Sequence, residues 1–505
     1  MHSLAPRFLS GGLSLAAALA IVSGPFAASA SADDIVFRPD DLVVSRSVYR
    51  GTASTVTIGK LLPPNCPATA TCGGTLNTGV PAIDNGLFPA IGSTNNVWNN
   101  DTVDGSFGVT SPIFLDDMTT QGRVVDTLPI DSHRIVTSFS SKSELALNLS
   151  ASRDALTFMG YVTPVNTLDA SNANTPGVVD PTNPVGENVY RAVAEVDDRG
   201  SLSITDTNAY SGNNGRAAIK SGGLYYAVGN DNNGGGTPTS LTTSTGAELI
   251  VPGATPGTPQ MIGNFSVTQY GLKADKAGKD NNFRGLAIFN NTLFVTKGSG
   301  SNGINTVYQV GAAGQLPTQA NAATQPITIL PGFPTTLAKD AGAQNPFGIF
   351  FANAKTLYVA DEGDGVAADA ATSPNAGLQK WVLDNSGTWH RVYVLQAGLN
   401  LGQPYSVKDY PTSLNPSPDG LRNLTGRVMG DGRVEIWAIT STVSANGDQG
   451  ADPNQLVVIS DRLANTDANA AKSERFTLLR TAGYGEVLRG VSFAPHSNSQ
   501  GDNQQ

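Results

Sequence analysis

Charged residues that could bind a ligand recur at the heads of short apolar runs along the chain. They are Glu144, Arg216, Arg284, Arg422 and Arg489. Guanidinium groups bind carboxylate and phosphate groups through paired hydrogen bonds, so arginines that converge would bind an anionic ligand. In the alternative interpretation, each arginine clamps its repeat to backbone carbonyls or aspartates of a neighbour. Glu144 departs from the arginine pattern, so we expect a salt-bridge partner, a metal ligand or a catalytic carboxylate there.

A second set of candidates lies in loops rich in Asp, Asn and Gly. Asp361, Glu362 and Asp364 belong to "VADEGDG", and Asp231 belongs to "VGNDNNGG". Oxygen ligands on glycine-rich turns suit Ca²⁺, because this ion accepts irregular coordination. None of these loops has the complete spacing of a calcium loop, and Asx-turns use the same residues without an ion. Ca²⁺ is thus a candidate cofactor, with these four acids as candidate ligands.

The segment "GSGSNG" after Lys297 matches the dinucleotide motif G-x-G-x-x-G. That motif binds a pyrophosphate only where it follows a strand and opens a helix. Here the segment leads from one expected strand, "TLFVTK", into another, "INTVYQV". We therefore expect a loop between two strands and no nucleotide site.

The elements that must position these residues repeat along the chain. A strand at Leu286–Phe289 is followed by an "NN" turn, the strand "TLFVTK", the Gly-rich loop, and the strands "TVYQV" and "PITIL". The same order recurs at first-strand positions 63 to 75 residues apart, namely Glu144, Arg216, Arg284, Phe347, Arg422 and Arg489. Six evenly spaced units of this kind predict an all-β fold, a six-bladed β-propeller of four-stranded antiparallel blades.

The two ends of the chain are each incomplete as blades. "VLRGVSFAP" supplies one strand near the C-terminus, whereas "DLVVSRSV", "SPIFLDD" and "RVVDTLPI" supply three strands near the N-terminus. Joining them completes a blade and removes unpaired sheet edges that would invite aggregation. We therefore expect the segment around Gly490 to pair with Val43 and Val44 and close the ring.

The long loops of the repeats are expected to gather on one face. In a four-stranded antiparallel blade, the start of strand one and the loop between strands two and three lie at the same end. The turns between strands one and two are short, whereas the loops between strands two and three are long and rich in Asn, Asp and Gly. Loops of this kind on a rigid scaffold commonly carry binding sites.

The first 32 residues have the pattern of an export signal. Arg7 precedes an apolar segment, "GGLSLAAALAIVSGPFA", and "ASA" supplies the small residues of a cleavage site. No apolar run is long enough to span a membrane. We expect a secreted or periplasmic protein, with a signal peptide at 1–32, one propeller domain at 33–496 and a disordered tail at 497–505.

The only two cysteines, Cys66 and Cys72, lie in "NCPATATC" within a long loop at 49–111. In an exported chain such a pair is expected to form a disulfide. With four histidines in the whole chain, a His-rich catalytic metal centre is not expected.

The charge balance argues against nucleic acid as a partner. Only 14% of the residues are charged and the formal net charge is −10. Nucleic-acid binding requires a basic surface that neutralises phosphates.

At "TLYVADEGDG" and "TLFVTKGSG" the chain resembles the NHL and SMP-30/gluconolactonase class of six-bladed propellers. The resemblance implies calcium-dependent lactonase or esterase activity with an acidic residue at the head of a first strand, a place that Glu144 occupies. The arginine-headed blades depart from that pattern. The segments "YSGNNGRAAIK", "NFRGL" and "SANGDQGADPNQLV" also resemble a family of uncharacterised secreted bacterial proteins, which implies no activity.

Three hypotheses for the function follow. The first is binding of an anionic or carbohydrate-like ligand at the loop-rich face. The second is a Ca²⁺-dependent hydrolase of a lactone or phosphate ester, with Glu144 and loop acids holding the ion. The third is a structural envelope protein whose channel is filled by apolar side chains.

Overall fold

The structure is a computed structural model, and it describes part of the chain. The described residues are 35–49, 108–142, 144–167, 169–179, 185, 187–230, 246–274, 279–410, 412–444 and 450–496. They belong to one compact unit, Asp34–Gln505. The expected signal peptide, the cysteine pair Cys66 and Cys72, Asp231 and the expected tail lie outside the described residues.

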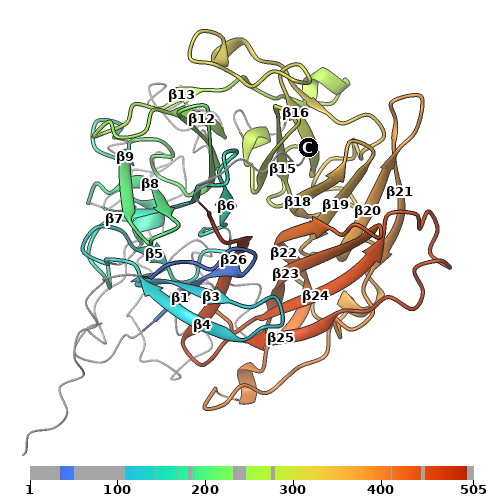
Figure 1. Cartoon of the computed structure of the whole chain (residues 1–505). Helices are drawn as coiled ribbons and strands as arrows, with labels where there is room; N and C mark the ends of the chain where they lie inside the picture. Colours follow the sequence, from blue (N-terminus) through green and yellow to red (C-terminus); the bar gives the residue numbers. More distant parts are fainter. Residues whose placement is uncertain are drawn as a thin grey trace, which may run out of the picture. The chain divides into compact units, whose positions relative to one another are not determined.

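Six four-stranded antiparallel sheets form a ring, which confirms the predicted six-bladed propeller (Figure 1). Blade 1 contains β26 (Glu486–Phe493), β1 (Leu42–Val48), β3 (Ile113–Met118) and β4 (Val124–Pro129). Blade 2 contains β6 (Asn148–Leu149), β7 (Ala155–Val162), β8 (Tyr190–Asp197) and β9 (Leu202–Thr207), and blade 3 contains β10 (Gly215–Ser221), β11 (Leu224–Gly229), β12 (Ala247–Ile250) and β13 (Gln260–Met261). Blade 4 contains β14 (Leu286–Phe289), β15 (Thr292–Lys297), β16 (Thr306–Val310) and β17 (Ile327–Ile329).

Blade 5 contains β18 (Pro346–Asn353), β19 (Thr356–Asp361), β20 (Gly377–Leu383) and β21 (Trp389–Leu395), and blade 6 contains β22 (Ser417–Val428), β23 (Arg433–Val443), β24 (Gln455–Arg462) and β25 (Thr477–Thr481). A small extra sheet pairs β2 (Thr110–Ser111) with β5 (Thr137–Ser138). The helices of the described residues are short 3-10 turns at Ala170–Asn172, Val267–Tyr270, Lys279–Asn281, Ala322–Thr324, Ala370–Thr372 and Thr412–Leu414.

Strand composition follows the position of each strand in its blade. The second strands β15 ("TLFVTK") and β19 ("TLYVAD") are buried at every residue, because both of their faces pack against neighbouring elements. The outer strand β4 has mostly exposed and half-buried residues. The predicted "NN" turn between β14 and β15 is confirmed, since Asn290 and Asn291 both have the positive φ that a tight hairpin requires.

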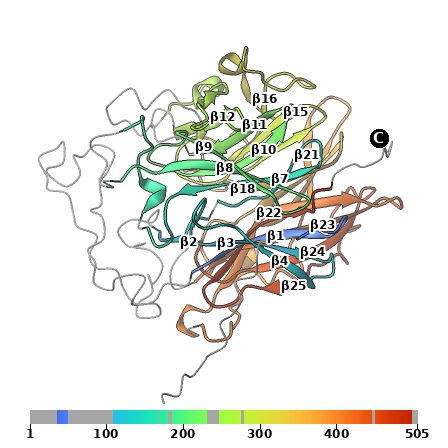
Figure 2. The ribbon, with the colours of Figure 1, turned by 60° about the vertical axis from the view of Figure 1, so that its left-hand side comes forward.

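The C-terminal strand closes the ring as predicted. In β26, Ser492 pairs with Val43 and Val491 pairs with Val44 of β1, and the register shifts between Val44 and Arg46. The two ends of the described chain therefore lie side by side in blade 1, where β1 and β26 meet in Figure 1. Figure 2 shows the blades from the side.

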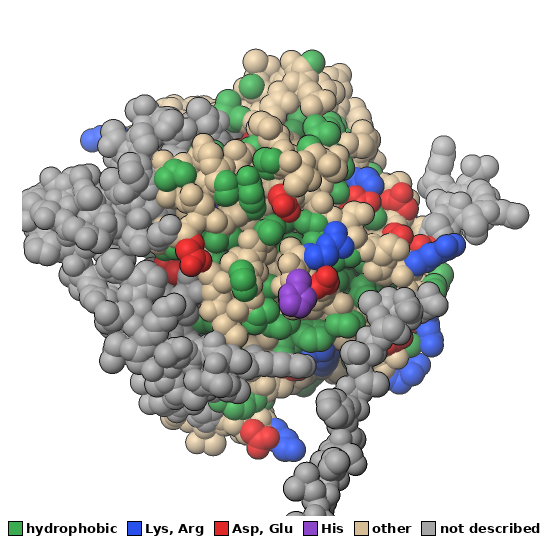
Figure 3. All heavy atoms as spheres, turned by 90° about the vertical axis from the view of Figure 1, so that its left-hand side faces the viewer, with side chains coloured by type: hydrophobic (Ala, Val, Ile, Leu, Met, Phe, Trp, Pro, Cys, Tyr) green, Lys and Arg blue, Asp and Glu red, His purple; other side chains and the backbone are tan. Residues whose placement is uncertain are grey.

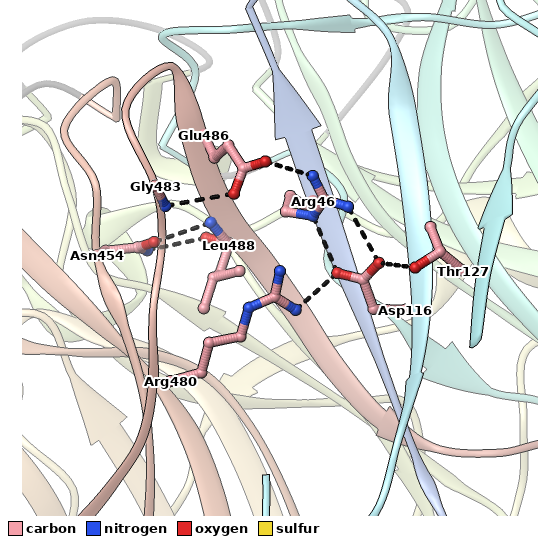
Figure 4. Close-up of polar contacts among 8 residues, drawn as sticks. All are labelled: Arg46, Asp116, Thr127, Asn454, Arg480, Gly483, Glu486 and Leu488. Carbon is pink, nitrogen blue, oxygen red and sulfur yellow. Dashed lines mark hydrogen bonds and ion pairs between the residues drawn. The ribbon is translucent and has the colours of Figure 1, made fainter. Parts of the chain in front are cut away.

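A polar network fastens this closing blade to its neighbour (Figure 4). Arg46 of β1 donates from Nε and Nη2 to the Asp116 carboxylate of β3, at 2.9 and 3.1 Å, and from Nη1 to Glu486 of β26. Arg480 of β25, in blade 6, donates to the same Asp116 carboxylate at 2.7 Å. Thr127 of β4 also donates to Asp116. One buried carboxylate thus joins both chain ends and two blades.

Replacing Asp116 with asparagine is expected to lower the free energy of unfolding by about 1–2 kcal/mol at neutral pH, because charge-assisted hydrogen bonds are lost. Burial alone raises the pKa of Asp116, but the hydrogen bonds from Arg46 and the charges of Arg480 and Arg46 outweigh it, so the pKa is lowered. The stabilisation by Asp116 is therefore present above its unfolded pKa of 3.8 and is lost as the pH falls through the lowered folded pKa.

Urea denaturation of the wild type and the Asp116→Asn variant at about pH 7 and about pH 3 checks this expectation. The difference between the two proteins should shrink at the lower pH. The control is Asp431→Asn, which removes the acid from an exposed ion pair with Arg433 and should unfold at nearly the same urea concentration as the wild type. A difference between wild type and Asp116→Asn that stays constant with pH would contradict the linkage.

The described surface has mixed polarity. On the side drawn in Figure 3, hydrophobic, acidic and basic side chains lie scattered among other side chains, and the basic ones do not gather into a patch. Within the described ranges, no helix has the length and apolar character needed to cross a membrane.

Candidate functional site

A cavity of about 500 Å³ opens at one end of blade 5. It lies between the connection that leads from β17 to β18 and the loop that leads from β19 to β20. Its described lining residues are Ala338, Asp340, Ala341, Gly342, Ala343, Asn345, Asp361, Gly363, Asp364, Asp369, Thr372, Ser373, Pro374 and Asn375. Because the start of a first strand and the end of a second strand meet at one end of a blade, this blade-5 pocket lies on the face predicted to be rich in loops.

Asp361 forms the buried wall of the blade-5 pocket. Its carboxylate accepts hydrogen bonds from the backbone nitrogen of Asn345 at 2.9 Å, from Nε2 of Gln379 at 3.0 Å, and from the backbone nitrogen of Gly363 at 3.1 Å. Burial, together with the adjacent Glu362 carboxylate, raises the pKa of Asp361 to about 6, against the lowering effect of the two backbone hydrogen bonds. These bonds hold the β19 end and the β18 start together.

The rim of the pocket is polar. Asp340, Asp364 and Asp369 are exposed there. Asn375 accepts a hydrogen bond from Nη1 of Arg391 at 2.7 Å, and its own amide nitrogen lies 3.5 Å from the carbonyl oxygens of residues 342 and 343 on the opposite wall. The described lining therefore contains four carboxylates and no lysine or arginine. It offers mainly acceptors to a ligand.

The structure divides the predicted calcium ligands between different environments. Asp361 and Asp364 line the blade-5 pocket, whereas Glu362 turns to Arg422, whose Nε lies 2.9 Å from Oε2 of Glu362. Within the described part of the chain, no group of three His, Cys, Asp or Glu residues could hold a metal ion. Asp231 lies outside that part. A bound Ca²⁺ stays a prediction.

The predicted arginines are held by contacts between blades. Arg216 of β10 donates to Oδ1 of Asn282 and to the backbone oxygen of Phe283 at the start of blade 4. Arg489 of β26 donates to the backbone oxygens of residues 139 and 141, which precede blade 2. Arg422 of β22 pairs with Glu362 of blade 5, and the Arg284 guanidinium lies 6.0 Å from the ring centre of Phe347 in β18. These contacts match the clamp interpretation, and a ligand role for the arginines stays a prediction.

Glu144 is fully buried and accepts hydrogen bonds with both carboxylate oxygens. Oε2 accepts from the hydroxyl of Thr137 and the backbone nitrogen of Ser138, each at 3.0 Å. Oε1 accepts from the Tyr161 hydroxyl and from Nδ2 of Asn214 at 2.8 Å. This carboxylate thus links blades 2 and 3, and a catalytic or metal-binding role for it stays a prediction.

Of the fourteen described lining residues of the pocket, only Asp361 and Asp364 were predicted from the sequence as site residues. Asp340, Asn345, Asp369 and Asn375 were not among the predicted site residues, although Asp369 and Asn375 belong to a loop predicted to lie on the functional face. For Asp340 and Asn345, the only signal in the sequence is the connection between Ile329 and Pro346, in which both residues lie. It is longer than a tight turn, and its second half, "AKDAGAQN", is rich in small and polar residues.

Comparisons with known proteins give only distant likenesses. No protein-family model and no curated protein matches the chain. The chain is similar in structure to a Thermus thermophilus protein assigned as an oxidoreductase (glucose dehydrogenase), with 13% identity, coverage of 65% of this chain and 87% of that chain, and a TM-score of 0.29. It is also similar to the computationally designed Ika8 protein (11% identity, 77% and 88% coverage, TM-score 0.27) and to the parainfluenza virus 5 hemagglutinin-neuraminidase ectodomain (8%, 76% and 76%, 0.33).

At these identities and TM-scores the likenesses carry no argument about activity or ligand. The resemblance to the NHL and SMP-30 class and to a secreted bacterial family stays a prediction.

Proposed function

We propose that this propeller binds a small hydroxyl-rich ligand of the carbohydrate class in the blade-5 pocket. The observation that carries the proposal is the cavity of about 500 Å³ with Asp340, Asp361, Asp364 and Asp369 in its wall. Small-molecule sites commonly have volumes of about 300–1,000 Å³. In keeping with the export-signal pattern of residues 1–32, we place this function outside the cytoplasm, in a secreted or periplasmic protein.

The chemistry of the lining favours hydroxyl donors over anions. An ionised carboxylate is only an acceptor and can bind several donors at once, and hydrogen bonds from hydroxyl groups to it are charge-assisted. The amide of Asn375 and the hydroxyl groups of Thr372 and Ser373 add groups that can donate or accept. An anionic ligand would meet four acidic side chains and no basic one among the described lining residues. Of the two ligand classes expected from the sequence, the carbohydrate-like one is therefore better supported here.

Asp364 offers a direct test, because it is exposed and its carboxylate accepts a local hydrogen bond, from the backbone nitrogen of Val366 at 3.0 Å. The purified protein would be screened by saturation-transfer NMR against neutral monosaccharides and disaccharides. For a sugar that binds, Asp364→Ala should weaken affinity by about tenfold, the loss of one charge-assisted hydrogen bond.

The matched control is Asp431→Ala, an exposed aspartate in the turn between β22 and β23. That turn joins strands one and two of blade 6 and therefore lies at the opposite face from the pocket. The control should bind sugar like the wild type. Equal affinity of Asp364→Ala and the wild type, or no saturable binding by any sugar in the panel, would overturn the proposal.

The other two hypotheses lack an observation that favours them. A Ca²⁺-dependent lactonase or phosphoesterase needs oxygen ligands that converge, and Glu144 and Glu362 are each engaged by other side chains. A structural envelope role predicts apolar side chains along the channel, whereas the first strands of three blades contain arginines, namely Arg216 near the start of β10 and Arg422 and Arg489 in the middle of β22 and β26. Both hypotheses stay predictions.

A further inference from the structure

A buried lysine and a buried asparagine contact each other at the two ends of the Gly-rich loop in blade 4. Lys297 is the last residue of β15, and Asn305 directly precedes β16. Nζ of Lys297 donates a hydrogen bond to Oδ1 of Asn305 at 2.9 Å. Lys297 is fully buried and Asn305 is only 3% exposed. The amine and the amide therefore meet inside the protein, away from bulk water.

Both side chains are held in place by further hydrogen bonds. Nζ of Lys297 also donates to the backbone oxygen of Ser299 at 3.0 Å, and Nδ2 of Asn305 donates to Oδ1 of Asn345 at 3.1 Å. The two strands are paired at this point, since Lys297 lies opposite Thr306. Reacting groups that are held at contact distance behave as if their concentration were very high.

The surroundings of Lys297 favour its neutral amine. Burial and the charges of Arg284 and Arg216 lower the pKa of Lys297 to about 7, although Asp280 acts in the opposite direction. Removal from water is a common way to activate a lysine, because the neutral amine has the lone pair that a nucleophile needs. The two hydrogen bonds of Nζ need only two N–H groups, so the neutral form keeps both.

The carboxylate of Asp280 lies beside this contact. A Cβ atom added to Gly303 would lie 3.0 Å from Cε of Lys297 and 3.3 Å from Oδ1 of Asp280, so both groups border the same small space. Asp280 is 4% exposed, and its Oδ2 accepts a hydrogen bond from the backbone nitrogen of Val267 at 3.0 Å. A carboxyl group positioned in this way can carry a proton between two nitrogen atoms.

From these contacts, we propose that Lys297 and Asn305 join in an intramolecular isopeptide bond in the folded protein. The lone pair of Nζ attacks Cγ of Asn305 and forms the new C–N bond. One proton passes from Nζ to Nδ2 through the Asp280 carboxylate, and the bond between Cγ and Nδ2 breaks to release ammonia. One amide replaces another, so no oxidant or other reactant is required. The bond closes the loop 298–305 covalently between β15 and β16.

The position of the leaving group agrees with this reaction. Nδ2 of Asn305 faces Asn345, which lines the blade-5 pocket, so ammonia would leave toward a cavity. The cross-link requires only side chains of blade 4 and involves no ligand. The inference therefore does not depend on the proposed sugar binding.

Tryptic digestion of the purified and denatured wild-type chain, followed by tandem mass spectrometry, tests the proposal. Trypsin cleaves after a lysine only when its side-chain amine is free. We expect residues 285–339 as one peptide that is not cleaved after Lys297 and is lighter by one ammonia molecule, about 17 Da. Separate peptides 285–297 and 298–339 would overturn the proposal. Cyclisation at Asn302-Gly303 also releases ammonia, but it leaves cleavage after Lys297 intact and would count against the bond.

The same digest contains a matched control. Nζ of Lys355 donates to Oδ1 of Asn385 at 3.2 Å, but both residues are exposed. Water surrounds this pair, so we expect complete cleavage after Lys355 and no loss of ammonia. A cross-link at the exposed pair as well would contradict the role assigned to burial.

Two variants assign the atoms of the reaction. Asn305→Ala removes Cγ, so trypsin should cleave completely after Lys297 and the loss of ammonia should disappear. A loss of ammonia that persists in this variant would overturn the assignment. Asp280→Asn should slow formation of the bond by about a hundredfold or more, the usual effect of removing a group that transfers a proton. An unchanged rate would contradict the part assigned to Asp280. Should either variant fail to fold, the wild-type peptide by itself decides whether the bond exists.

Discussion

Replacing Lys380 with methionine is expected to lower the free energy of unfolding by about 3–5 kcal/mol, the largest effect of any single substitution considered for this protein. Lys380 of β20 and Asp461 of β24 are both fully buried, and Nζ lies 3.0 Å from Oδ2 of Asp461. Nζ also donates to the Tyr393 hydroxyl at 2.9 Å and to the backbone oxygens of residues 462 and 465. The variant would leave the Asp461 carboxylate and these carbonyl groups buried without their cation.

The pair joins blade 5 to blade 6, so its loss should weaken the ring at that boundary. Urea denaturation monitored by tryptophan fluorescence would measure the change. Lys355→Met is the matched control, because Lys355 belongs to the same blade but is exposed, and its Nζ donates to Asn385 at 3.2 Å. It should change stability by about 0.5 kcal/mol or less. Similar unfolding curves for Lys380→Met and the control would show that the pair contributes little.

Replacing Gly490 with alanine should lower the free energy of unfolding by about 3 kcal/mol through overpacking at the ring closure. A Cβ atom on Gly490 would lie 2.4 Å from the backbone nitrogen of Leu147 and 2.5 Å from the backbone oxygen of Leu145. Both are backbone atoms at the start of blade 2. Two hydrogen bonds keep the Gly490 backbone close to blade 2. The Gly490 nitrogen donates to Oγ of Ser45, and Oγ of Ser45 donates to the backbone oxygen of Leu145.

Gly430→Ala is the control for this substitution. Gly430 lies in the turn between β22 and β23 and has no positive φ, and a Cβ atom added to it would have no heavy atom within 4 Å. Its replacement should leave stability within about 0.5 kcal/mol of the wild type. Thermal denaturation of both variants checks the pair. If Gly490→Ala had the same melting temperature as the control, the start of blade 2 would be able to shift away from the added Cβ atom with little loss of stability.

Glycine after a first-strand anchor recurs elsewhere in the ring for the same reason. A Cβ on Gly285 would lie 2.4 Å from the backbone oxygen of Phe347, and one on Gly348 would lie 2.8 Å from the backbone oxygen of Arg422. The innermost strands of neighbouring blades converge toward the axis, so their backbones come closer there than side chains permit. In the Arg-Gly segments at 284–285 and 489–490, the arginine contacts the neighbouring blade through its side chain, and the glycine lets the backbones of the two blades come close together.

The architecture of this protein could be predicted from the sequence because the signals are local and repeated. Leu286–Phe289 and Thr292–Lys297, joined by Asn290 and Asn291, contain their own strand and turn chemistry within twelve residues. The ring closure followed from counting strands at the two ends, since one lone strand and three others complete a blade. Neither prediction required knowledge of which side chains touch.

The candidate sites depended on contacts that only the tertiary structure supplies. Adjacent residues Asp361 and Glu362 appeared equivalent as metal ligands, yet the first lines the blade-5 pocket and the second pairs with Arg422 of another blade. Asp340 joins Asp364 in one pocket only because the connection before β18 folds against the loop after β19. Strand periodicity is a property of neighbouring residues, whereas the partner of a charged side chain is set by packing between blades that are distant in sequence, and no local pattern encodes it.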